Sequence, residues 1–103
     1  MMPAEVADAL AEAHPTLTGA ALDELAHSID RTRAAQVLYE FTNGREGSRP
    51  DEFRAALYRA MSKAAPVNMA RLVDAFPLES LAFSVAQFVP NGLAAIRAAA
   101  RRG

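Results

Sequence analysis

The chain contains no cysteine and only two histidines among its 103 residues. The absence of cysteine excludes disulfide bonds, thiolate nucleophiles and thiolate metal sites, so nothing requires an oxidising compartment. The first residues also lack a basic segment followed by an apolar run, which is the pattern of a secretory signal. We therefore expect a cytoplasmic protein.

Long hydrophobic runs are also missing. The longest stretch without a charged residue runs from Ser80 to Ile96 and approaches the length of a membrane span. Gln87 lies inside this stretch, and Pro90, Asn91 and Gly92 interrupt it. The pattern favours buried helices, so we expect no association with a membrane.

Residues that favour strands are scarce. No run of β-branched or aromatic residues alternates as a strand requires, whereas alanine, a helix former, accounts for 24 residues. A chain of this length buries roughly two-thirds of its unfolded surface in one domain. We predict a single helical domain over residues 1–103, all-α, built as a compact irregular bundle of five to seven short helices. Helix number alone leaves a six-helix packing like that of the death fold open.

Lysine and arginine are absent from the first 30 residues. Residues 1–30 hold six acidic side chains and no lysine or arginine, whereas residues 31–103 hold eleven basic and six acidic side chains. The two segments could pair within the fold, direct head-to-tail association, or offer a basic face to an acidic partner. We favour pairing within the fold.

The clearest helix begins at Pro50, whose fixed φ suits the first helical position. Asp51 and Glu52 place negative charge in the first turn, where the helix dipole favours it. Pro66 cannot continue the helix, which should end near Ala64. One face repeats apolar residues at helical spacing and should be buried: Phe53, Leu57, Ala60, Met61 and Ala64.

A second helix follows at once. Either Pro66 is its first residue or Asn68 is its N-cap, and Pro77 ends it. Its apolar stripe consists of Leu72, Val73 and Phe76.

The run from Phe53 to Pro77 contains the pattern A-x-P-x-N-x-x-x-L-x-x-x-F-P, made by Ala64, Pro66, Asn68, Leu72, Phe76 and Pro77. This pattern resembles a motif of small helical proteins from tailed phages and prophages, most of which have no assigned activity. The resemblance covers about a quarter of the chain. The chain departs from the motif at Ala65, where an acidic cap before the proline is common. The resemblance implies a phage origin and carries no catalytic residue.

Helices are also predicted before this stretch. Residues 3–13 form a first helix with a thin apolar stripe, which should dock loosely. Thr18 is the expected N-cap of a helix that reaches Ile29. The apolar phase then slips, which predicts a bend near residues 28–32 and a further helix to about Thr42; one bent helix is the alternative.

The region after Pro77 should be the most buried element, because apolar residues dominate it. Its pattern fits either a helix kinked at Pro90 or two helices, and the cost of about 3 kcal/mol for an internal proline favours the break. Together with the helix over 50–64, the helix over 78–89 should be central to the bundle.

Candidate chemistry is sparse. Asp23, His27 and Asp30 would share a face of a continuous helix and could bind a divalent metal, but a structural zinc site needs more histidine or cysteine ligands. The sequence contains no G-x-S-x-G turn and no glycine-rich nucleotide loop. We expect no enzymatic activity, no metal and no cofactor.

Nucleic-acid binding is the alternative function. Six arginines in the middle of the chain could place a basic helix in a groove: Arg31, Arg33, Arg45, Arg49, Arg54 and Arg59. Interspersed acidic residues and a net charge of −1 disfavour this interpretation.

The leading hypothesis is a small helical protein–protein interaction module, a phage accessory protein that binds a host or phage protein. Its predicted surface combines Arg45 and Arg49, in the exposed and mobile loop over 43–49, with Tyr58 and Arg59 on the exposed side of the next helix. Arginine and tyrosine are enriched at interaction hot spots. Self-association through the apolar region 78–96 is a second possibility.

Overall fold

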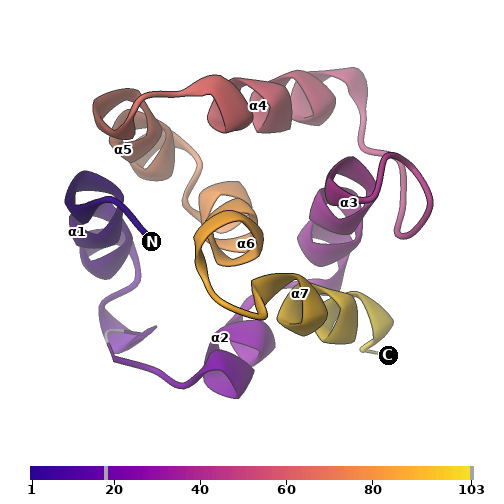
Figure 1. Cartoon of the computed structure of the whole chain (residues 1–103), viewed down its shortest axis with the longest axis horizontal. Helices are drawn as coiled ribbons and strands as arrows, with labels where there is room; N and C mark the ends of the chain where they lie inside the picture. The colour runs from indigo at the N-terminus through magenta and orange to yellow at the C-terminus, as the bar shows by residue number, and fades with distance from the viewer. Residues whose placement is uncertain (18, 103) are drawn as a thin grey trace.

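The computed structural model describes residues 1–17 and 19–102, which form seven α-helices, one 3₁₀ turn and no strand (Figure 1). The predicted all-α bundle is confirmed. The elements are α1 (Ala4–Ala13), the 3₁₀ turn η1 (Pro15–Leu17), α2 (Leu22–Ser28), α3 (Arg31–Phe41), α4 (Glu52–Lys63), α5 (Pro66–Ala75), α6 (Pro77–Phe88) and α7 (Gly92–Arg101).

Helix α6 lies at the centre, and the other helices surround it (Figure 1). It packs against α1, α3, α4, α5 and α7, and its seven residues from Glu79 to Val85 are all buried. The prediction that this region is the most buried element is confirmed. Helix α4 is not equally central: it lies at the edge of the bundle, where it packs on α3 and α6.

The helix boundaries follow local signals, with one correction. Helix α4 does not begin at Pro50, because the side chain of Asp51 accepts a hydrogen bond from the backbone N–H of Arg54 at 2.7 Å and so serves as the N-cap. Pro66 is the first residue of α5. The predicted break at Pro90 is confirmed, with Asn91 at a φ of 61° between α6 and α7.

The predicted bend near residues 28–32 is also confirmed. Helix α2 ends at Ser28, and Asp30 caps a separate helix α3 by accepting a hydrogen bond from the N–H of Arg33 at 2.9 Å. Helix α2 begins at Leu22; the predicted N-cap, Thr18, lies outside the described residues. Helix α1 does not dock loosely, because it packs along α5 with Val6 fully buried.

The loop over 43–49 is exposed, as predicted, but it is held against the bundle at several points. The hydroxyl of Thr42 accepts a hydrogen bond from the N–H of Glu46, and the N–H of Ser48 donates to the carbonyl of Ala35. The carboxylate of Glu46 also receives two hydrogen bonds from Arg97 of α7, at 2.7 and 3.0 Å. These contacts join the loop to α3 and α7.

Among the described helices, none combines the length and the apolar character that crossing a membrane would require.

Candidate functional site

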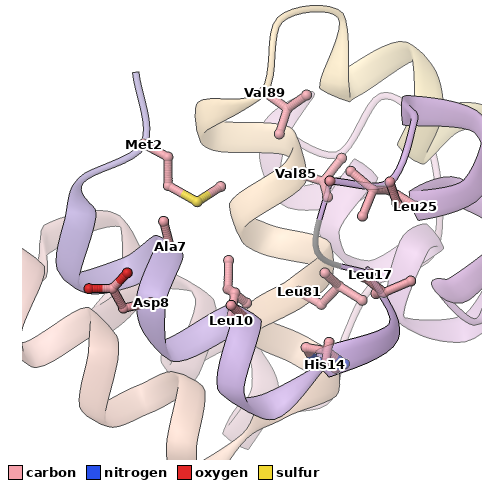
Figure 2. Close-up of a pocket in the computed structure, with 13 residues that line it drawn as sticks. Met2, Ala7, Asp8, Leu10, His14, Leu17, Leu25, Leu81, Val85 and Val89 are labelled. Atoms are coloured by element: carbon pink, nitrogen blue, oxygen red, sulfur yellow. The ribbon is translucent and has the colours of Figure 1, made fainter.

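An open apolar pocket of about 420 Å³ lies between α1, η1, α2 and α6 (Figure 2). We call it the α1–α6 pocket. Its volume is within the range typical of ligand sites. Thirteen of the described residues line it, and most are apolar: Met2, Ala7, Asp8, Leu10, Ala11, His14, Leu17, Gly19, Ala20, Leu25, Leu81, Val85 and Val89.

The pocket forms because α1 packs against α5 and α6 whereas α2 packs against α7, which leaves a space beside α6 between α1 and α2. Leu81 and Val85 of α6 are buried, whereas Leu17 and Leu25 are only partly buried. Figure 2 shows the side chains of Met2, Leu10, Val85 and Leu25 around one common space. Large apolar side chains therefore remain accessible in a concave surface.

His14 fixes one end of the pocket. Its Nε2 lies 2.9 Å from the carbonyl oxygen of Pro77 and donates a hydrogen bond to it. This bond joins the end of α1 to the start of α6. His14 therefore holds the end of α1 against the start of α6 at the border of the pocket.

A second hollow, of about 450 Å³, lies between α2 and α7. Its lining consists mainly of alanine, with Leu22, Asp23, His27 and Asn91. Alanine offers little apolar area for a ligand to bury. The α1–α6 pocket is the better candidate site for that reason.

The electrostatic surroundings of the α1–α6 pocket are acidic. None of the four elements that form it contains a lysine or arginine. Of the six acidic residues in 1–30, Asp30 alone forms an ion pair within the described part of the chain, with Arg33 of the neighbouring turn. The favoured interpretation, pairing between the two halves of the chain, is therefore wrong for the other five, which remain exposed: Glu5, Asp8, Glu12, Asp23 and Glu24.

Tyr58 does not lie on an exposed surface, which corrects one of the four predicted partner-binding residues. It is only 1% exposed, its ring stacks on Phe83 at 6.5 Å, and its hydroxyl donates to Oε1 of Gln36. Burial, with the negative charge of Glu79, raises the pKa of Tyr58, so the hydroxyl stays protonated. The predicted apolar face is rotated: Phe53 is 57% exposed and Tyr58 takes its place in the core.

The other three predicted residues are exposed, but on two separate elements. Arg45 and Arg49 lie on the loop, whereas Arg59 lies on α4. Arg59 borders a hollow of about 280 Å³ whose other described lining residues are Glu40, Phe41, Tyr58, Ser62, Phe83 and Gln87. The loop arginines do not line this hollow. Partner binding by the three exposed arginines stays a prediction.

A buried carboxylate that sequence reasoning missed organises two of the central arginines. Oε2 of Glu79 lies 3.3 Å from Nε of Arg33 and 3.2 Å from Nε of Arg54. The contact with Arg54 is a hydrogen bond, whereas Nε of Arg33 is not aligned for one. Each arginine also pairs with the capping aspartate three residues before it, Asp30 or Asp51. The repeated D-x-x-R spacing could have indicated the two aspartate–arginine pairs. No local sequence pattern indicates that Glu79 lies beside both arginines.

The proposed metal ligands do not share one helix. Helix α2 ends before Asp30, which caps α3 instead, and Nδ1 of His27 lies 2.7 Å from the backbone carbonyl of Asp23. Within the described residues, no group of three acidic or histidine side chains is arranged to hold a metal ion.

Comparisons with protein-family models, with curated proteins and with solved structures find no match to this chain. The fold and the site together define a small all-helical protein with an open apolar pocket beside two acidic helices.

Proposed function

We propose that this chain is a small helical protein–protein interaction module that binds an apolar segment of its partner in the α1–α6 pocket. The observation that carries the proposal is the pocket itself, a concave apolar surface in which Met2, Leu17, Leu25 and Val89 are only partly buried. Desolvation of such concave apolar surface is a main source of affinity at interaction hot spots.

The chemistry of the lining supports binding. Apolar side chains dominate it, and His14 already uses one ring nitrogen to bond the backbone. Apolar pockets with few polar groups favour recognition of shape and hydrophobic area.

The sequence also suggested two other roles, that of a phage accessory protein and that of a nucleic-acid-binding protein. A role as a phage accessory protein rests on the resemblance in residues 53–77 alone. Nucleic-acid binding has less support, because Arg33 and Arg54, two of its six arginines, are engaged by Glu79. Exposed arginines remain, so nucleic acid belongs in the test as a competitor.

The test is selection from a library of displayed helical peptides, with a variant whose pocket is filled. Ala7 is exposed and lines the pocket, so Ala7→Trp should fill it without disturbing the core. Ala60→Trp is the matched control, an exposed alanine of α4 outside this pocket. Selected peptides should bind the parent chain and Ala60→Trp alike, and Ala7→Trp about tenfold more weakly or worse. Selected peptides that bind all three equally, or that duplex DNA displaces, would overturn the proposal.

A further inference from the structure

We infer that the occupant of the α1–α6 pocket is an amphipathic helix with a basic polar face. This inference rests on the proposed function and adds the chemical class of the partner. It starts from the combination of an apolar pocket with two bordering helices, α1 and α2, that contain acidic side chains and no lysine or arginine.

Two of the elements that form the pocket, α1 and α2, carry exposed acidic side chains. Helix α1 contributes Glu5, Asp8 and Glu12, and α2 contributes Asp23 and Glu24 in its first turn. All five are exposed, and none has an ion-pair partner in the described residues. Asp8 is also a lining residue of the pocket, and Figure 2 shows its carboxylate on the side of α1 that is turned away from Leu10 and Val85.

No basic side chain from these elements offsets the five carboxylates. Their summed field attracts a cationic partner and repels an anionic one, because like charges that face each other across an interface cost free energy. The basic residues of the described chain that form ion pairs, Arg33, Arg54 and Arg97, lie on α3, α4 and α7. Negative charge beside the pocket is thus left for a partner to neutralise.

The secondary structure of the occupant follows from the fold. The described residues contain no strand, so no sheet edge exists to which an extended peptide could add. A pocket between helices instead accepts apolar side chains at the i, i+3, i+4 and i+7 positions of another helix. The apolar residues of that helix would occupy the pocket, and its lysines or arginines would lie over α1 and α2.

Three synthetic peptides of about four helical turns test this inference. They share one apolar stripe and carry lysine, glutamine or glutamate on the polar face. Affinity is measured by fluorescence anisotropy at about 0.05 M and about 0.5 M salt, because salt screens exposed charges. The lysine peptide should bind at least about tenfold more tightly than the glutamine peptide at low salt, and the glutamate peptide most weakly. The differences should shrink at high salt.

Two sets of variants locate the effect. The triple variant Asp8→Asn, Asp23→Asn, Glu24→Gln should remove most of the preference for lysine, whereas Glu52→Gln with Asp74→Asn, exposed acids on α4 and α5, should preserve it. Ala7→Trp should weaken the lysine and glutamine peptides alike. Circular dichroism checks that each variant is folded.

The outcomes separate the inference from the proposed function. Equal affinity for all three peptides, lost in Ala7→Trp, would overturn the basic partner and leave the apolar pocket as a binding site. Binding of the lysine peptide alone, unchanged in Ala7→Trp, would overturn both, as would the absence of binding by any peptide. Concentration-dependent dimerisation that Ala7→Trp abolishes would assign the pocket to a second copy of the chain and overturn the basic helix.

Discussion

Gly47 is the residue on which the conformation of the α3–α4 loop depends most directly. Its φ is +80°, and a Cβ atom there would lie 2.1 Å from the carbonyl oxygen of Ala35. Gly47→Ala should therefore lower the free energy of unfolding by about 1–3 kcal/mol. Gly19→Ala is the control, because Gly19 has a φ of +73° but a Cβ atom there would meet no atom of the described residues within 4 Å. Urea denaturation measures both, and an equal loss in the two variants would contradict the steric explanation.

Glu79 is the buried residue that balances the charge of two partly buried arginines. It is only 5% exposed, and Arg33 and Arg54 both approach one of its oxygens. Glu79→Gln preserves the shape but removes the charge, so Arg33 and Arg54 would lose the carboxylate between them and each would keep only its pair with a capping aspartate. We expect a loss of stability several times that of Glu52→Gln, an exposed neutralisation on α4. Thermal denaturation of both variants at pH 7 decides this, and similar melting temperatures would show that Glu79 contributes little.

At the scale of the element, helix α3 depends on its cap. Asp30 accepts from the N–H of Arg33 and begins a helix where α2 has just ended. Asp30→Ala should cost about 1 kcal/mol, whereas Asp30→Asn should cost much less, because asparagine caps as well as aspartate does. The midpoint of urea denaturation measures the difference. If asparagine fails to rescue stability, the ion pair with Arg33 rather than the cap is what Asp30 provides.

Local sequence patterns predict where the helices begin and end, but they do not predict which face of α4 is buried. Prolines and capping residues act within one or two turns, so the breaks at residues 28–32, Pro66 and Pro90 were predictable. The rotation of α4 was not, because Phe53, Leu57 and Met61 fit an apolar face as well as Leu57, Tyr58 and Met61 do. The contacts of Tyr58 with Phe83 and Gln36 decide between them, and they join residues far apart in the chain.

At the scale of the whole molecule, acid should loosen the bundle. The hydrogen bond from Arg97 lowers the pKa of Glu46 from 4.5, and the backbone hydrogen bond from Arg54 lowers the pKa of Asp51 from 3.8. A carboxyl whose folded pKa is lowered stabilises the fold above its unfolded pKa, and this stability disappears as the pH falls through the folded pKa. The melting temperature should therefore fall as the pH drops below 4.5.

Glu46→Gln tests the contribution of the loop to this behaviour. It removes one of the two carboxyl groups whose pKa is lowered in the folded state. The variant should therefore be less stable than the parent chain at pH 7, and it should lose less stability on acidification. The experiment measures the slope of the melting temperature against pH between neutral and acid pH, with Glu52→Gln as the control. A slope identical to that of the parent chain would mean that the pair of Glu46 and Arg97 does not couple the loop to α7.

The amino-acid sequence by itself determined the fold class and most helix boundaries, because alanine content, prolines and caps act locally. Only the tertiary structure decided what the helices bury and expose. Tyr58, predicted at the surface, lies in the core, and Glu79 contacts two arginines. The acidic residues of α1 and α2 form no ion pairs within the described residues, and these helices border an apolar pocket. Each of these results depends on how α6 brings distant segments together, and no local pattern along the chain encodes that packing.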